Sequence, residues 1–457
     1  MCASAQPGPV AAPGPMRYRG RPFAPRFALP VTSLAFDLTR LVTRLRFATP
    51  SGIDRVDLAY ARHVLAQPGE RFGVVSTPFG PRVLDRTGAG ALVERVAAGW
   101  AEEIGAGDDP VYHRLLGALG AGTAGPAPAA RGPEGRWARQ HRRRAWAATS
   151  LEILRRPGPG RLPAGTTYLH TSHLRLDRPE RFDWLYDRRD VRALFLVHDL
   201  IPIEFPEYGR GAESVRHAER MRTVSRHAAA VIANSADVAS RLRAHLAGRS
   251  LPCPPVTVAH LGIEPAFGAS EGPAPVPDRP TFVACSTIEP RKNHLMLLSV
   301  WRDLAARLGP ATPRLVLVGR RGWESENIAD MLDRCPAVRA HVVEVAGLST
   351  AGLVRLMRGA TGLLMPSFAE GYGLPVLEAA AAGLPVVASD IPVHREIAAG
   401  FAEFVHPLDG PGWSRLVEAL AQDGSPLRRE MTARLDGFRP PSWAEHFATV
   451  EPLLAGA

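Results

Sequence analysis

The stretch Pro366–Asp390, PSFAEGYGLPVLEAAAAGLPVVASD, carries the densest pattern in the chain. It begins at the end of an apolar run that predicts a buried strand, and a loop with Glu370, Gly371 and Gly373 follows. A helix is expected from about Pro375, because proline suits the first turn of a helix. Glycines directly before a helix let backbone N–H groups approach an anion closely, and the helix dipole favours negative charge there. The stretch therefore predicts an anion site at the junction of a strand and a helix.

Two carboxylates flank this junction, Glu370 in the loop and Glu378 one turn into the helix. Carboxylates do not neutralise a phosphate, so we expect them to hold hydroxyl groups. A sugar and a ribose on either side of a diphosphate fit that arrangement. Taken alone, Glu370 is more often a helix cap and Glu378 a solvated side chain, and it is their combination with the glycines, the strand before and the helix after that favours a site.

The stretch Glu289–His294, EPRKNH, contains Lys292, the only lysine in a chain with 55 lysines and arginines. An ammonium is a compact point charge, whereas a guanidinium is a wide planar fork. A single retained lysine is either a coding accident or a position that needs the smaller cation.

Apolar strands alternate with helical patterns on both sides of a proline-rich stretch, residues 271–280. This alternation predicts two α/β domains with parallel sheets that face each other across a cleft, where the carboxyl ends of the strands meet. The predicted strands lie in residues 192–200, 229–235, 281–287, 314–320, 341–347, 361–367 and 385–390. We expect a disordered segment at 1–30, an N-terminal domain at 31–270, a linker at 271–280, a C-terminal domain at 281–437, and a last helix in 438–457 that packs toward the N-terminal domain.

Composition excludes several classes of protein. No apolar run reaches the length of a membrane span, and the four cysteines lack metal-ligand spacing. A P-loop is excluded because the sole lysine is not in a Gly-Lys-Ser/Thr sequence. These features favour a cytoplasmic protein without a structural metal.

Charge is distributed unevenly along the chain. Residues 1–270 hold 37 basic against 24 acidic residues, a balance of +13, whereas residues 271–457 hold 18 against 21, a balance of −3. The asymmetry indicates that the first half meets something anionic, unless it is an ordinary solvated surface. The segment RWARQHRRRAW, residues 136–146, predicts a basic helix.

The spacing of Glu370 and Glu378, with GLPVVASD after them, resembles the EX7E motif of the family 4 retaining glycosyltransferases. The resemblance covers residues 282–407 strongly and 192–262 clearly, and it is weak before residue 190. It implies the GT-B fold, with two Rossmann-like domains. The first would bind mainly the acceptor and the second the nucleotide sugar. STIEPRKNH, LVGRRGWE and VHDLIPIEFPEY resemble the members that build bacterial surface polysaccharides.

The resemblance also implies roles for single residues on the donor side. Glu370 would contact the hydroxyls of the donor sugar, and Glu378 the ribose. Lys292 would bind the diphosphate. The backbone and loop positions expected to contact the donor are Gly371, Tyr372, Gly373, Leu374 and Gly319.

Three further positions are expected near the reaction. His198 resembles the family histidine beside the transferred sugar, although a core histidine at a strand end fits the pattern too. Gly52, in SGIDRV, resembles the glycine loop on the acceptor side, and a plain helix start is the alternative. Many family members have an arginine where this chain has Ser286, so Arg291 would supply the second charge, or that charge is absent.

The implied reaction is metal-independent and needs no cofactor beyond the donor, GDP-mannose or a UDP-sugar. The expected partners are the nucleotide sugar, a lipid-linked saccharide acceptor and, as a peripheral contact, the anionic inner face of the cytoplasmic membrane. Three other readings stay open: a GT-B sugar-nucleotide epimerase, a phosphorylase-like enzyme with pyridoxal phosphate on Lys292, and a basic nucleic-acid-binding protein.

Overall fold

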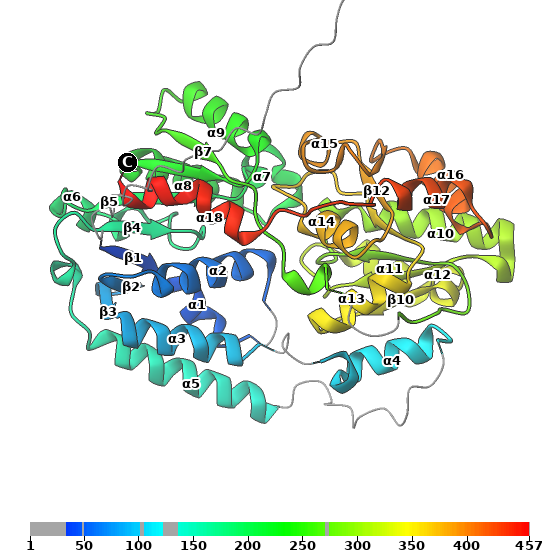
Figure 1. Cartoon of the computed structure of the whole chain (residues 1–457), viewed down its shortest axis with the longest axis horizontal. Helices are drawn as coiled ribbons and strands as arrows, with labels where there is room; N and C mark the ends of the chain where they lie inside the picture. Colours follow the sequence, from blue (N-terminus) through cyan, green and yellow to red (C-terminus); the bar gives the residue numbers. More distant parts are fainter. Residues whose placement is uncertain (1–32, 48–49, 101–104, 122–135, 270–273, 457) are drawn as a thin grey trace, which may run out of the picture.

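The computed structural model describes residues 33–47, 50–100, 105–121, 136–269 and 274–456. The segment expected to be disordered, residues 1–30, lies outside the described residues, as do positions 271–273 of the expected linker. Within the described part, two sheets form the centres of two α/β domains (Figure 1).

The N-terminal domain has a seven-stranded sheet of order β3-β2-β1-β4-β5-β6-β7. Its strands are β1 (Leu34–Asp37), β2 (Arg71–Thr77), β3 (Gly80–Asp85), β4 (Thr167–His170), β5 (Arg192–Val197), β6 (Ala230–Ala233) and β7 (Val256–Val258). Its helices are α1 (Thr39–Arg44), α2 (Gly52–Ala66), α3 (Arg86–Ala98), α5 (Arg136–Leu154), α6 (Trp184–Asp187), α7 (Ile201–Glu204), α8 (Glu213–His227) and α9 (Ala236–Gly248).

The C-terminal domain has a six-stranded sheet of order β10-β9-β8-β11-β12-β13, parallel throughout. Its strands are β8 (Thr281–Cys285), β9 (Arg314–Val318), β10 (Val342–Val345), β11 (Gly362–Met365), β12 (Val386–Ser389) and β13 (Glu403–Val405). Its helices are α10 (His294–Leu308), α11 (Glu326–Arg334), α12 (Pro336–His341), α13 (Thr350–Gly359), α14 (Leu374–Ala381), α15 (Pro392–Ala398), α16 (Gly410–Ala421) and α17 (Pro426–Ala433).

The predicted fold class is confirmed, with one correction. Each of the seven predicted apolar runs contains a strand, but β3 pairs antiparallel with β2 through a tight hairpin at the edge of the first sheet. The expected parallel pairing therefore holds in both sheets except at this edge. A two-stranded hairpin needs only a short turn, and Gly80 supplies it with a φ of 88°.

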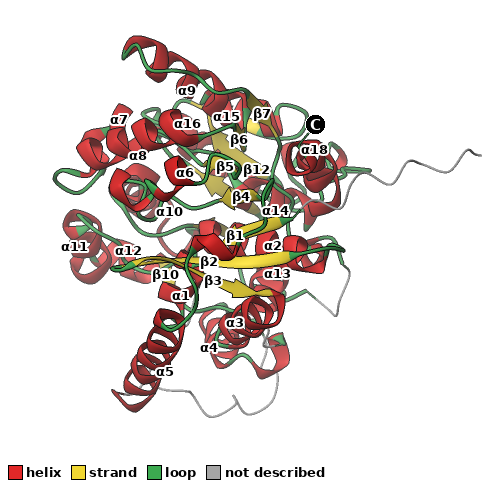
Figure 2. Ribbon diagram, turned by 90° about the vertical axis from the view of Figure 1, so that its left-hand side faces the viewer, coloured by secondary structure: helices red, strands yellow, loops and turns green. Residues whose placement is uncertain are grey.

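Successive residues of a central strand belong to different apolar clusters, as expected for a sheet covered on both faces. In β5, Leu194 and Leu196 belong to one cluster, and Phe195 and Val197 to another. The first of these clusters also contains residues of the C-terminal sheet, so the apolar core continues from one domain into the other. Figure 2 shows the strands between layers of helices.

The last helix, α18 (Trp443–Ala455), returns to the N-terminal domain (Figure 1). Its His446 ring accepts a hydrogen bond from the hydroxyl of Tyr60 on α2, with 2.6 Å between Tyr60 Oη and His446 Nε2. At its end, Arg192 Nη1 donates to the carbonyl of Leu453 over 2.5 Å. The two domains are thus joined both by the chain before β8 and by the chain before α18.

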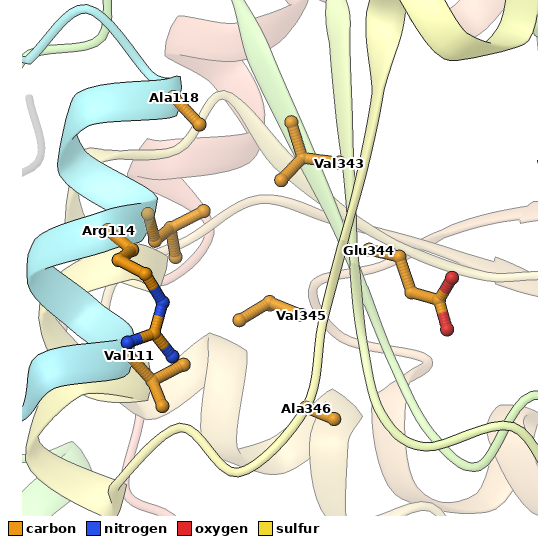
Figure 3. Close-up of a pocket in the computed structure, with 8 residues that line it drawn as sticks. Val111, Arg114, Ala118, Val343, Glu344, Val345 and Ala346 are labelled. Atoms are coloured by element: carbon orange, nitrogen blue, oxygen red, sulfur yellow. The ribbon is translucent and has the colours of Figure 1, made fainter. Parts of the chain in front are cut away.

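One helix of the N-terminal half packs on the other domain instead. Helix α4 (Pro110–Ala118) lies beside β10, the edge strand of the C-terminal sheet. A pocket lies between α4 and β10, and Figure 3 shows Val111, Arg114 and Ala118 lining it on the side of α4. The carboxylate of Asp109 caps α4 at Val111 N over 2.8 Å, and its other oxygen accepts from Ser349 N, which precedes α13, over 2.8 Å.

Candidate active site

Lys292 lies at the end of a short 3-10 turn, Pro290–Lys292, that follows β8. Its ammonium donates to Glu370 Oε1 over 2.5 Å, and Arg291 Nη1 donates to Glu370 Oε2 over 2.9 Å. Arg291 Nη2 also donates to Glu289 Oε1 over 2.9 Å. The two carboxylate oxygens of Glu370 are therefore each held by a cation from the same turn.

Burial and the neighbouring charges shift the pKa values of these groups in opposite directions. Burial alone would raise the pKa of Glu370, but Lys292 and Arg291 outweigh it and hold that pKa far below the usual range of a carboxyl. Burial lowers the pKa of Lys292 and is opposed by Glu370. Burial likewise works against the charge of Arg291, but Glu370 and Glu289 outweigh it and raise its pKa. The site is a preorganised set of fixed charges in a poorly solvated environment.

The turn ends at a residue that positions it. Asn293 has a φ of 57°, a left-handed conformation that asparagine tolerates better than most residues. Its side-chain amide donates to the carbonyls of Pro366, over 3.1 Å, and Pro407, over 2.8 Å. This side chain ties the turn after β8 to the loop after β11, which carries Glu370.

The loop between Glu370 and α14 needs its glycines for two different reasons. Gly373 has a φ of 119°, where a side chain would be strained. Gly371 has no such constraint, but a Cβ there would lie 2.2 Å from the carbonyl oxygen of His198. Gly373 thus shapes the helix start, and Gly371 lets this loop touch the N-terminal domain. In the first turn of α14, Pro375 has no N–H group, and the N–H of Val376 donates to the carbonyl of Gly373 over 3.0 Å.

Further hydrogen bonds hold the loop against the N-terminal domain. Ser235 Oγ donates to the carbonyl of Gly371 over 3.1 Å, and Tyr372 Oη donates to the carbonyl of Leu261 over 3.0 Å. The backbone amide groups of Gly371, Tyr372, Gly373 and Leu374 therefore lie at the domain interface.

Glu378 lies one turn into α14, and its side chain is 5% exposed. Its Oε1 lies 3.2 Å from Nη1 of Arg55, which belongs to α2 of the other domain. The structure thus gives each of the two glutamates of the motif a basic partner, one from within the C-terminal domain and one from across the interface.

His198 follows β5 and is buried. Its Nε2 lies 2.6 Å from the carbonyl of Thr171, so Nε2 carries the proton and Nδ1 is the acceptor atom of the ring. Burial lowers the pKa of His198 to about 4, and the ring is neutral at pH 7. The structure brings its backbone carbonyl against the loop of Gly371.

Of the two remaining predicted glycines, Gly319 has a steric reason to be glycine and Gly52 does not. A Cβ at Gly319, directly after β9, would lie 1.9 Å from the carbonyl oxygen of Ser286. Gly52 is the first residue of α2, which Ser51 and Asp54 cap reciprocally, and a Cβ at Gly52 would lie 3.7 Å from Leu374. Gly52 is therefore a helix start, and it also lies against the first residue of α14.

A charged cluster on α1 and α2 was missed by the sequence analysis. Asp54 Oδ1 accepts from Arg40 Nε over 2.5 Å and from Arg44 Nε over 2.8 Å. Asp57, one turn further along α2, accepts from Thr171 Oγ1 over 2.7 Å. Burial raises the pKa of Asp57 to about 7, although Arg40 opposes the shift. The only sequence signal was the capping pattern of Ser51 and Asp54, which indicates a helix start and no more.

No cluster of histidine, cysteine, aspartate and glutamate side chains in the described ranges has the arrangement of a metal site. Within the same ranges, no helix combines the length and apolar character that crossing a membrane requires.

The fold and the position of the charged loops define a GT-B protein. The structure of HepE from Anabaena in complex with UDP-glucose superimposes with a TM-score of 0.58 at 14% identity, over 93% of this chain and 100% of that chain. At this identity the likeness concerns the fold alone.

Residues 279–423 match the family model described as "Glycosyl transferases group 1". This region of the chain is therefore similar to the group 1, or family 4, glycosyltransferases, and the chain has the GT-B fold. The serotype-specific mannosyltransferase WbdA of Escherichia coli is 30% identical over 45% of this chain and 27% of that protein. The O-antigen chain mannosyltransferase B of Escherichia coli is 34% identical over 32% of this chain and 38% of that protein. The matched region is thus about a quarter of the length of WbdA.

Proposed function

We propose that this protein transfers a sugar, with retention of configuration, from a nucleotide sugar to a saccharide acceptor in the synthesis of a cell-surface polysaccharide. The observation that carries the proposal is the arrangement of Lys292, Arg291 and Glu370 beside the N-terminus of α14, at the interface between two Rossmann-like domains. Mannose from GDP-mannose is the proposed sugar, because relatives over part of the chain are mannosyltransferases. A UDP-sugar is the alternative donor.

The proposed mechanism follows from the charges. When the bond between the sugar and the diphosphate breaks, negative charge grows on the β-phosphate. Lys292 and the amide groups of Gly373 and Leu374 would stabilise that charge without reorganising, which is where fixed charges accelerate a reaction most. The leaving phosphate would take the proton of the acceptor hydroxyl.

In this mechanism Glu370 binds the hydroxyls of the donor sugar. Glu370 as a covalent nucleophile is disfavoured, because Lys292 and Arg291 each hold one of its oxygens and hold its pKa far below the usual range. Such a carboxylate is a weak nucleophile. His198, with a neutral ring, would lie beside the transferred sugar and accept through Nδ1.

The direct test is thermal unfolding in the presence of GDP-, UDP- and ADP-sugars. A ligand at 100 times its dissociation constant adds about 2.7 kcal/mol of stability. We expect stabilisation by one base class, GDP-sugars first, and the same shift in EDTA. If no nucleotide sugar raises the unfolding temperature, or if the shift requires Mn²⁺ or Mg²⁺, the proposal in this form is contradicted.

We further propose that the protein binds the inner face of the cytoplasmic membrane peripherally, since its acceptor would be lipid-linked. The basic helix α5 supports this in part. Arg143 and Arg144 are exposed, whereas Arg142 is only half-exposed, and the side chain of Arg139 lies outside the described residues. Arg143 and Arg144 are therefore the described arginines of this group that are best placed to meet a membrane surface.

The test is co-sedimentation of the full chain with vesicles rich in phosphatidylglycerol. Each basic side chain near an anionic surface contributes about 1 kcal/mol, so we expect the double variant Arg143→Gln, Arg144→Gln to bind roughly thirtyfold more weakly. The matched control changes two exposed arginines of the C-terminal domain, Arg334→Gln and Arg415→Gln. Equal losses in both double variants, or binding that ignores lipid charge, would refute the membrane proposal.

A further inference from the structure

Helices α2 and α14 begin side by side, although they belong to different domains. Gly52 and Leu374 are the first residues of the two helices, and a Cβ at Gly52 would lie 3.7 Å from Leu374 Cδ1. One turn further along each helix, Arg55 Nη1 lies 3.2 Å from Glu378 Oε1. The first turns of the two helices therefore meet across the interface at these two positions.

The ion pair between Arg55 and Glu378 is largely shielded from solvent. The side chain of Arg55 is 22% exposed and that of Glu378 is 5% exposed. A carboxylate so buried is costly unless a cation or several hydrogen bonds compensate it. In this arrangement Arg55 is a cation that the N-terminal domain supplies to the donor side.

The position of Arg55 also gives it access to the start of α14. Long side chains on a helix lean toward the N-terminus of their own helix, and the N-terminus of α2 is the end that touches Leu374. A rotamer that leans in this direction would bring the guanidinium from Glu378 toward the first turn of α14. The planar guanidinium matches phosphate oxygens in geometry and in charge.

We infer that Arg55 is a donor-binding residue contributed by the N-terminal domain, and that it exchanges Glu378 for the donor diphosphate when the ribose hydroxyls bind Glu378. This inference rests on the proposed function, which places the ribose at Glu378 and the diphosphate at the start of α14. The exchange replaces one carboxylate partner with a more highly charged one, and it leaves Glu378 hydrogen-bonded to the ribose. The donor site is then complete only when both domains contribute to it.

The exchange predicts opposite effects on two probes, a nucleoside and its diphosphate. In Arg55→Ala, the ribose of guanosine no longer competes with an arginine for Glu378. GDP has the same ribose, but its diphosphate loses the cation that Arg55 supplies. We expect calorimetric titration to show GDP binding weakened roughly ten- to hundredfold, with guanosine bound at least as tightly as by the parent protein. Uridine and UDP replace this pair if UDP-sugars stabilise the parent.

Two further variants separate the inference from a structural role. Arg62→Ala, two turns further along α2 at a pair with Glu94 within the same domain, is expected to leave both affinities unchanged. Glu378→Gln is expected to lower the affinities for guanosine and for GDP by the same factor. Unfolding curves establish that each variant is folded.

The inference is overturned if Arg55→Ala weakens guanosine and GDP equally, since Arg55 would then only orient Glu378, or if it leaves GDP binding unchanged. If the parent protein binds neither GDP nor UDP, the proposed function fails together with the inference, and that failure is visible before any variant is made.

Discussion

The two domains meet with charged groups that are organised in different ways. On the C-terminal side the groups come from two short loops, and Glu370 lies between two cations at the interface. On the N-terminal side they come from α1, α2 and the end of β4, and they are largely neutralised within the domain. There Asp54 is held by Arg40 and Arg44, and Asp57 is buried against Thr171.

This difference shows that the two domains contribute different kinds of groups to the site between them. The C-terminal side keeps a lysine and a helix start where a diphosphate can reach them. The N-terminal side buries most of its charges, and its Arg55 forms an ion pair with Glu378 of the other domain. The predictions below test whether the two sides differ as described.

The largest effect is expected for Asp57→Asn, on the N-terminal side. The pKa of Asp57 is about 7 in the folded protein because of burial, against a usual 3.8. A raised pKa contributes stability that is present below pH 4 and is lost as the pH rises through 7. The difference in unfolding free energy between parent and variant should therefore change by about 4 kcal/mol over this window, in favour of Asn at high pH.

Denaturant unfolding between pH 5 and pH 8 measures most of this change. Asp330→Asn, at a half-exposed position on α11, is the control and should show no comparable trend. A parent-to-variant difference that stays constant across the range would mean that Asp57 is ionised in the fold, and that the N-terminal side is not buried as described.

An intermediate effect is expected for Gly371→Ala, at the contact between the two sides. The new Cβ would lie 2.2 Å from the carbonyl oxygen of His198. This oxygen belongs to the backbone, so no side chain can rotate away to relieve the clash. Overpacking of this kind costs about 1–3 kcal/mol, and we expect sugar transfer to fall with it, because the loop of Glu370 must shift. Gly90→Ala on α3, where the added methyl meets no atom within 4 Å, should leave transfer unchanged and cost no stability, because alanine is the better helix former. Normal stability and transfer in Gly371→Ala would show that the domains do not close on this loop.

The smallest effect is expected for Tyr60→Phe, at the contact of α18 with the N-terminal domain. His446 donates through Nδ1 to the carbonyl of His260, so its Nε2 accepts from Tyr60. Burial lowers the pKa of His446 to about 4, so the ring stays neutral and needs this donor. Removing the hydroxyl should lower the unfolding free energy by about 1 kcal/mol. Tyr186→Phe, with a half-exposed ring, serves as the control. Equal stability of the two variants would mean that the bond to α18 contributes nothing.

The different organisation of the two sides also explains what the sequence could predict. Lys292 and Glu370 follow β8 and β11, which are neighbours in a parallel sheet, so their loops meet at one edge. Local patterns identified both loops and the helix after them. The family match covers the same region, residues 279–423.

Arg55 and Glu378 lie 323 positions apart, and no local pattern connects them. The burial of Asp57 depends on the packing of α2 against Thr171 at the end of β4. The two elements are far apart in the sequence, so this packing follows from the order of the strands in the sheet and from no local pattern. The docking of α4 on β10 was missed for a similar reason, because a short amphipathic helix does not specify which sheet it covers. Sequence therefore predicted the loops of one domain well and the interface between domains poorly.

The central claim is that Lys292 and the start of α14 hold the diphosphate of a nucleotide sugar. The most direct measurement is the release of nucleoside diphosphate in EDTA, from the nucleotide sugar that stabilises the protein most, with a lipid extract as the acceptor source. The parent, Lys292→Met and Lys292→Arg are compared after unfolding curves show that all three are folded.

The account predicts full activity of the parent in EDTA and a loss of at least tenfold in both variants, since a charge-assisted contact contributes about 1.5–3 kcal/mol and the wider guanidinium does not replace the ammonium. Full activity of Lys292→Arg, or a parent that is inactive in EDTA and restored by Mn²⁺, would contradict it.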